Sequence, residues 1–156
     1  MAVSNLLRRR SNLFKSSRVL LALAILASLI SFAKFSHCER NGWASPDNYI
    51  HACYTDIAPL YGERSLDKDI WPYASGEKSV EYPTLMGVVM YLTALPANNF
   101  HSYYFINIFF LALLFIATVL LLQRIGAYGF YYALAPAVIS SLFINWDLWA
   151  MPTMLL

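Results

Sequence analysis

The sequence predicts an all-α membrane protein with several transmembrane helices and a large loop outside the bilayer. The 156 residues are 59% hydrophobic and only 13% charged, whereas a soluble domain carries about 25% charged residues. The apolar residues form blocks without charge at 19–33, 103–122 and 127–146. The last two blocks have about the 20 residues that a helix needs to cross a bilayer. Eight of the nine acidic residues lie between Glu39 and Glu81, in the stretch that separates these blocks.

Residues 1–18 are predicted to form a basic cytoplasmic tail, and residues 19–35 the first transmembrane helix. The tail has no acidic residue and ends its basic series at Arg18. Positive charge flanking an apolar segment marks its cytoplasmic side. The small-x-small sequence at 31–33 also resembles a signal-peptide cleavage site. We favour an uncleaved helix, because Lys34 follows at once and further apolar segments come later.

Residues 36–102 are predicted to form one outer loop that includes a helix lying on the membrane surface at about 82–95. That apolar stretch is bounded by Pro83 and Pro96, and it is too short to span a bilayer. Proline suits the first turn of a helix. The charge pattern therefore predicts that the chain stays outside from Ser36 to Ser102.

Two further transmembrane helices are predicted at 103–122 and 128–144. The first ends at Gln123-Arg124, which fits a cytoplasmic turn, so the second returns outward and brings Asp147 to the outer face. Residues 148–156 are predicted to start another transmembrane helix. We therefore expect the chain to be the N-terminal part of a longer multi-pass protein with a cytoplasmic N-terminus in the cell membrane.

Cys38 and Cys53, the only cysteines, are predicted to form a disulfide. Both lie in the predicted outer loop, and an oxidising compartment favours a bridge. Two alternatives stay open. The thiols are free, or they bind zinc together with His37 and His51, although the spacing lacks the C-x-x-C element usual in zinc sites.

Several acidic residues are candidates for chemistry, each with a structural alternative. Asp56 lies close to the predicted disulfide and suits a rigidly held general base, but aspartate is also a good cap for a helix at 57–61. Glu81 precedes the predicted surface helix and can stabilise its N-terminus by charge. Asp67 and Asp69 form a D-x-D pattern associated with metal-bound sugar nucleotides, yet a solvated turn is favoured. Asp147 is the lone acid in an apolar stretch, where acids are functional by default, although it also suits a helix cap.

Aromatic residues crowd the predicted loop. Tyrosine and tryptophan faces suit sugar rings, but these residues also collect at membrane interfaces, which is the favoured interpretation for most of this set: Trp43, Tyr49, Tyr54, Tyr61, Trp71, Tyr73 and Tyr82.

The loop motifs together resemble a known family. In order, they are Cys38 with Gly42-Trp43, residues 49–57 (YIHACYTDI), Leu60-Tyr61-Gly62, residues 71–73 (WPY) and 81–83 (EYP), with 145–148 (NWDL) as a second motif. They resemble the N-terminal part of actinobacterial membrane glycosyltransferases of the GT-C class, similar to the family 87 mannosyltransferases that use polyprenyl-phosphate sugars. The resemblance covers about 38–148, and it implies a GT-C-like fold whose first outer loop carries the catalytic acid.

The resemblance implies mannosyl or hexosyl transfer from polyprenyl phosphate to a lipid-linked or cell-envelope glycan on the outer face. Asp56 would take the proton of the acceptor hydroxyl, with Glu81 as a second catalytic acid. Arg64 would balance the leaving phosphate, and Tyr54, Tyr82 and Asp147 would bind substrate. No cofactor is required, although a divalent cation is compatible with this chemistry.

Two other functions remain as alternatives: a transporter or flippase subunit, and a non-catalytic assembly protein of the envelope. Transport would favour paired, broken helices in repeats, and the sequence has no internal repeat. The sequence also has no P-loop, no GxGxxG and no Ser/His/Asp arrangement, which disfavours nucleotide-driven transport and hydrolase chemistry. The expected partners are the sugar donor, the glycan acceptor and membrane lipids, not nucleic acid.

Overall fold

The computed structural model describes residues 2–74, 79–126 and 128–156, with side chains from Ser17 onward. The basic side chains of the predicted tail before Arg18 therefore lie outside the described residues, as do residues 75–78 of the predicted outer loop. Within the described ranges the chain is all-α. Its helices are α1 (Ala2–Arg40), α2 (Asp47–Ile50), α3 (Ile57–Glu63), η1 (Leu66–Lys68), α4 (Thr84–Ala94), α5 (Phe100–Arg124), α6 (Gly129–Leu134), α7 (Pro136–Ser141), η2 (Asp147–Trp149) and α8 (Ala150–Met154).

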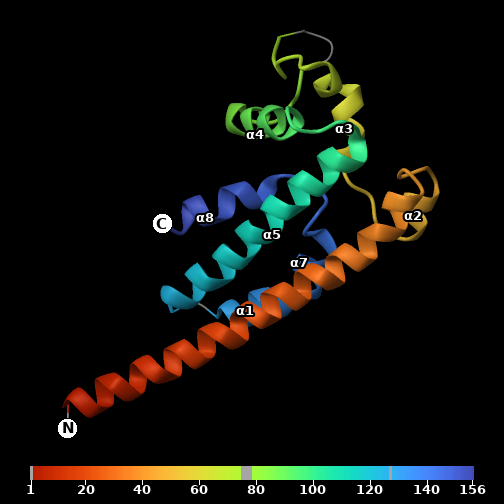
Figure 1. The fold of residues 1–156 in the computed structure, drawn as a ribbon. Coiled ribbons are helices and arrows are strands. Elements are labelled where there is room, and N and C mark those ends of the chain that lie inside the picture. Colours follow the sequence, from red (N-terminus) through yellow and green to blue (C-terminus); the bar gives the residue numbers. More distant parts are fainter. Residues whose placement is uncertain (1, 75–78, 127) are drawn as a thin grey trace.

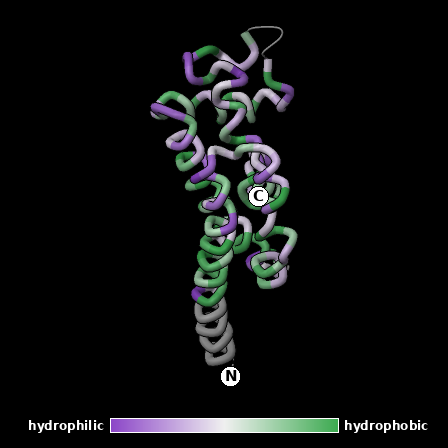
Figure 2. The backbone as a smooth tube through the Cα atoms, turned by 90° about the vertical axis from the view of Figure 1, so that its right-hand side faces the viewer, coloured by the Kyte–Doolittle hydropathy of each residue, from purple (hydrophilic) through white to green (hydrophobic). Residues whose placement is uncertain are grey.

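Helices α1 and α5 run side by side in opposite directions (Figure 1). The segments from α2 to α4 lie together at the end where α1 finishes and α5 begins. Most hydrophilic residues gather at that end, while the helical stem below it is mainly hydrophobic (Figure 2). We call the polar end, from α2 to α4, the head, and the apolar part formed by α1, α5, α6 and α7 the stem.

Two helices of the described chain, Ser17–Arg40 and Phe100–Arg124, are long and apolar enough to cross a membrane. At 1.5 Å per residue each is about 36–38 Å long, against about 30 Å of bilayer hydrocarbon. A signal sequence or the core helix of a soluble protein has similar length and composition. The prediction of an all-α fold is confirmed, and so is the presence of two long apolar helices.

One face of helix α1 buries small residues, while several large side chains on its other faces are exposed. Ala24, Ala27 and Ser31 are at most 2% exposed, and their spacing places them on one helical face. Ile25 and Leu29 on the other faces are 43% and 57% exposed. Small residues let the neighbouring helices α5, α6 and α7 approach the α1 backbone closely.

Helix α5 begins at Phe100, three residues before the predicted start. Asn99 forms a capping box with Ser102: the Asn99 side chain accepts the Ser102 N–H, and the Ser102 hydroxyl accepts the Asn99 N–H. Such reciprocal bonds satisfy N–H groups that a helix start leaves unpaired. The cap therefore sets the start of the helix ahead of the apolar run.

Helix α4 is the short helix predicted at about 82–95. Its 11 residues span about 16 Å, about half the hydrocarbon thickness. Tyr73 positions its start, because the Tyr73 hydroxyl donates to the carbonyls of Tyr82 and Pro83 at 2.9 and 3.0 Å. Met90, fully buried, helps to hold α4 against α5, since its carbonyl accepts the Tyr103 hydroxyl at 3.3 Å.

The prediction of one helix over 128–144 is wrong. The segment instead forms α6 and α7, which are separated at Ala135. Pro136 is the reason, because proline disfavours helical geometry in the preceding residue and lacks an N–H for the helix ladder. Ala135 accordingly has extended φ and ψ angles of −65° and 120°. The Lys34 ammonium donates to the Ser140 carbonyl at 2.7 Å, which ties the end of α7 to α1.

Gly129 permits close packing of α6 on α5. A Cβ atom at this position would lie 2.6 Å from the Val119 carbonyl oxygen, a backbone atom that cannot move aside. We predict that Gly129→Ala destabilises the protein by about 1–3 kcal/mol, as overpacking does. Gly62→Ala is the matched control, because nothing lies within 4 Å of its Cβ position. Thermal unfolding in detergent, followed by circular dichroism, should show a lower Tm for the first variant alone. Equal Tm values would contradict the packing.

Candidate functional site

Asp56 stands at the N-cap position of α3, but its side chain makes no capping hydrogen bond. The hydroxyl of Thr55 accepts the Ile57 N–H instead, at 3.2 Å. The Asp56 carboxylate accepts hydrogen bonds from the hydroxyls of Tyr54 and Tyr82, the latter at 3.0 Å. The capping alternative for this residue is therefore wrong, and its carboxylate is left for another role.

The backbone of residues 143–144 holds the segment that carries Asp56. The Thr55 hydroxyl faces the carbonyl oxygens of Phe143 and Ile144 at 2.9 and 3.0 Å. The Asp56 N–H donates to the Ile144 carbonyl at 2.8 Å. Thr55 is 1% exposed, so these bonds are shielded from water. We call these contacts the Thr55 clamp.

Trp146 and Asn107 support the site from below. The indole N–H of Trp146, which is fully buried, donates to the Asn107 side-chain oxygen at 2.7 Å. The Thr93 hydroxyl lies 3.2 Å from the same oxygen. The ring of Tyr82 meets Trp146 edge to face at 5.5 Å. A buried polar network with satisfied partners fixes a unique packing, and here it fixes the ring that bonds to Asp56.

The two tyrosines are held in their neutral, donating form. The hydrogen bond to Asp56 is the main reason why the pKa of Tyr54 rises to about 12, with burial adding to it. Burial raises the pKa of Tyr82 still further, and its bond to Asp56 acts in the same direction. Both phenols therefore remain hydrogen-bond donors to the carboxylate well above neutral pH.

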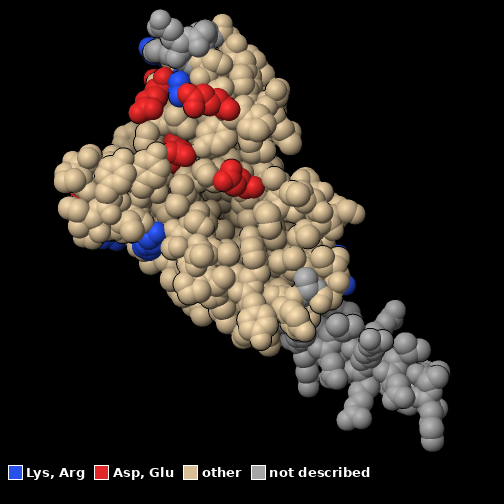
Figure 3. Space-filling model, turned by 180° about the vertical axis from the view of Figure 1, so that it is seen from behind, with Lys and Arg blue, Asp and Glu red and all other residues tan. Residues whose placement is uncertain are grey.

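A cavity of about 330 Å³ opens beside the carboxylate. It is lined by Asp56, Leu60, Arg64, Val80, Glu81, Tyr82 and Pro83. Acidic side chains gather in the upper part of one face of the molecule (Figure 3). The sequence thus identified four residues that the fold brings to one cavity: Asp56, Arg64, Glu81 and Tyr82.

Arg64 and Glu81 form only a loose pair. The closest nitrogen–oxygen distance is 3.9 Å, and the Glu81 side chain is 91% exposed while that of Arg64 is 24% exposed. A pair with one fully hydrated member contributes little. Within the described part of the chain, the Arg64 Nε atom is buried without a hydrogen-bond partner. Because Arg64 lines the cavity and is only loosely paired with Glu81, its guanidinium has capacity to bind an anion there.

Asp147 lies near the cavity but does not line it. Its charge and that of Asp56 both act on the Tyr82 hydroxyl. The Asn145 amide donates to the Asp147 carboxylate at 2.9 Å, and both residues line a neighbouring cavity of about 240 Å³. Asp147 is the first residue of the short helix η2, whose N-cap residue is Trp146. The fold thus places the predicted substrate-binding acid beside the Asp56 cavity rather than within it.

The remaining predicted residues fall into structural roles. Cys38 and Cys53 form a disulfide with Cα atoms 6.0 Å apart, so their sulfur atoms are not zinc ligands in this structure. Asp67 and Asp69 are exposed, as expected for a solvated turn. Trp43 belongs to the aromatic set for which the interfacial belt is the favoured interpretation, but it is 6% exposed and packs edge to face on an aromatic ring of α5.

The sequence prediction missed Thr55 and Asn107. Thr55 stands inside the recognised motif, but its role depends on carbonyls 88 and 89 residues away. Asn107 had a signal, because it is a lone amide in the apolar run at 103–122. A polar side chain in such a run needs a buried partner, which here is Trp146.

No protein-family model, curated protein or solved structure matches this chain. A proposal for its function therefore depends on the geometry above and on the resemblance of its loop motifs.

We predict that Thr55→Val weakens the Thr55 clamp. Valine keeps the shape, but it removes the bond to the carbonyls and leaves the Ile57 N–H without its partner, at a cost of about 1–3 kcal/mol. Thr118→Val is the control, because the buried Thr118 hydroxyl only donates back to the Leu114 carbonyl within α5. Thermal unfolding in detergent should give a lower Tm for Thr55→Val than for Thr118→Val. A Thr55→Val protein as stable as Thr118→Val would contradict the clamp.

Proposed function

We propose that the chain belongs to an integral membrane glycosyltransferase that moves a sugar from polyprenyl phosphate to a glycan acceptor. The observation that carries the proposal is the cavity that holds both Asp56 and Arg64. Glycosyl transfer from a phosphate donor needs a base for the acceptor hydroxyl and positive charge for the leaving phosphate. The family resemblance of the loop motifs points to the same reaction.

The membrane location is supported by the surface of the two long helices. In the 18-residue apolar stretch of each helix, only 28% and 33% of the residues are buried, whereas the core helix of a soluble protein is mostly buried. Their exposed apolar side chains include Leu29 on α1 and Phe109 on α5, at 57% and 61% exposure. Such a continuous apolar surface is unfavourable in water and favourable in lipid.

In the proposed reaction, the acceptor oxygen attacks the anomeric carbon of the sugar while the Asp56 carboxylate takes the hydroxyl proton. The bond between that carbon and the phosphate oxygen breaks, and its electron pair leaves with the polyprenyl phosphate. Tyr54 and Tyr82 hold the carboxylate in place, since both donate to it. Arg64 faces the cavity and would balance the phosphate charge. Because phosphate is a good leaving group, positioning supplies much of the rate.

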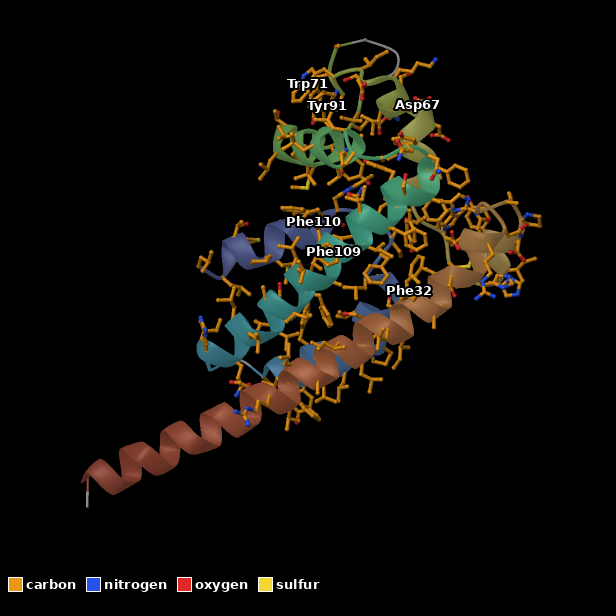
Figure 4. All side chains as sticks on the ribbon, viewed as in Figure 1. Phe32, Asp67, Trp71, Tyr91, Phe109 and Phe110 are labelled. Atoms are coloured by element: carbon orange, nitrogen blue, oxygen red, sulfur yellow. A yellow bond between two sulfur atoms is a disulfide. The ribbon has the colours of Figure 1, made fainter. Side chains whose placement is uncertain are left out.

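An apolar groove beside the clamp suits the lipid part of such a donor. It measures about 360 Å³ and lies between α1 and α5, where Phe32, Phe105 and Phe109 contribute to its wall. Phe32 and Phe109 are labelled on their helices in Figure 4. Phe143 also lines the groove, and its carbonyl is one acceptor of the Thr55 clamp. The groove thus adjoins the segment that carries Asp56.

We predict that Asp56→Asn lowers sugar transfer by about 10²–10⁴-fold, the usual contribution of a positioned general base. The assay uses the protein in liposomes that contain a labelled polyprenyl-phosphate hexose, and it measures new glycosidic bonds. Asp67→Asn is the control, because Asp67 is exposed and does not line the Asp56 cavity.

Three results would contradict this assignment. Near-normal turnover of Asp56→Asn would remove Asp56 as the base. Loss of transfer in Asp67→Asn would favour the D-x-D interpretation instead. Movement of the labelled lipid across the bilayer without a new glycosidic bond would favour the flippase alternative.

A further inference from the structure

We propose that His37, Asp47 and His51 form a binding site for a divalent transition-metal ion such as Zn²⁺. The site lies outside the Asp56 cavity and does not depend on the proposed transfer reaction. Its three side chains offer two imidazole nitrogens and a carboxylate oxygen, all within 4.8 Å of one another. Imidazole and carboxylate together suit Zn²⁺ and its first-row neighbours better than Mg²⁺ or Ca²⁺.

The three side chains already contact one another at hydrogen-bond distances. The His37 Nε2 atom lies 3.1 Å from Asp47 Oδ2, and the His51 Nδ1 atom lies 2.9 Å from Asp47 Oδ1. Ligand atoms at about 2.0–2.1 Å from a tetrahedral ion are about 3.4 Å from each other. The carboxylate therefore stands between the two imidazoles at nearly the spacing that coordination requires. The two rings themselves are 4.1 Å apart at their centres.

The Cys38–Cys53 disulfide brings the three ligands together. His37 precedes Cys38, and His51 is two residues before Cys53, so each imidazole is anchored next to one end of the bridge. Asp47 lies within the loop that the bridge closes and begins α2. Holding ligands on a closed loop reduces the entropy lost when an ion orders them.

Asn41 orients the carboxylate from outside the ligand set. Its side-chain amide donates to Asp47 Oδ2 at 3.0 Å. A hydrogen bond of this kind from outside the ligand set holds the carboxylate in one orientation, as the neighbours of metal ligands commonly do. His37 and His51 have side chains 52% and 48% exposed, which gives an ion an open path and leaves room for a water ligand.

His101 provides an internal comparison. It is the third histidine of the chain, and its Nδ1 atom lies 2.7 Å from a carboxylate oxygen of Glu39. Within the described residues no second histidine or further acid joins this pair into a metal-binding group. It is therefore a histidine–carboxylate pair of similar exposure that lacks the third ligand.

The test measures Zn²⁺ binding to the full chain, purified in detergent without a histidine tag and stripped with EDTA. Equilibrium dialysis with metal analysis should give one Zn²⁺ per chain, and Co²⁺ should give the visible absorption of a four-coordinate site. His37→Ala and His51→Ala should each weaken binding by at least tenfold, while His101→Ala keeps it. Asp47→Asn, which keeps the side-chain size, should also weaken binding at least tenfold.

Circular dichroism and mass mapping of the disulfide establish whether each variant retains its fold. If a histidine variant fails to fold, Zn²⁺ binding by Asp47→Asn tests the proposal in its place. Absence of bound Zn²⁺ in the unmodified chain would overturn the proposal. Equal loss in His101→Ala and His37→Ala, or full binding by Asp47→Asn, would overturn it as well.

Discussion

The Thr55 clamp is the contact on which the rest of the site depends. It joins the head of the molecule to the turn after α7 through the carbonyls of Phe143 and Ile144. These two carbonyls lie beyond the end of α7, so no N–H of that helix pairs with them. The hydroxyl of Thr55 and the N–H of Asp56 pair with them instead, which holds the Asp56 segment in place. Thr55 also accepts the first N–H of α3, from Ile57, while the Asp56 carboxylate makes no capping bond to that helix.

The stem of the molecule makes this contact possible. Small residues on α1 let α5, α6 and α7 pack closely around it, and the break at Pro136 turns the chain within the stem. The segment at 143–147 therefore reaches the head without a continuous helix. The buried Trp146 then meets both Asn107 of α5 and the ring of Tyr82, so the stem and the head are fixed to each other.

Patterns with a local physical cause were readable in the sequence. Apolar length predicted α5, the short α4 and the apolar part of α1 at 19–35, although α1 extends from Ala2 to Arg40. The shared loop predicted the pairing of Cys38 with Cys53. Contacts between distant segments could not be predicted from the sequence. The Thr55 hydroxyl, for example, has many possible partners, and only the fold determines which of them it meets. The single helix expected at 128–144 was wrong because hydropathy outweighed Pro136, whose steric effect on Ala135 decides the local backbone. Asp56, Arg64, Glu81 and Tyr82 were named from motifs, but only the fold places them around one cavity.

We propose that α1 and α5 anchor the head, with its Asp56 cavity, on the outer side of a membrane. Maleimide labelling tests this directly, because the two native cysteines are bridged and give no background. Asn98→Cys lies beside the head, and Tyr128→Cys, at a site 77% exposed, lies beyond the opposite end of α5. In intact cells, an impermeant maleimide should label Asn98→Cys and reach Tyr128→Cys only after the membrane is opened. Labelling of both positions in intact cells, or of Tyr128→Cys alone, would contradict the account.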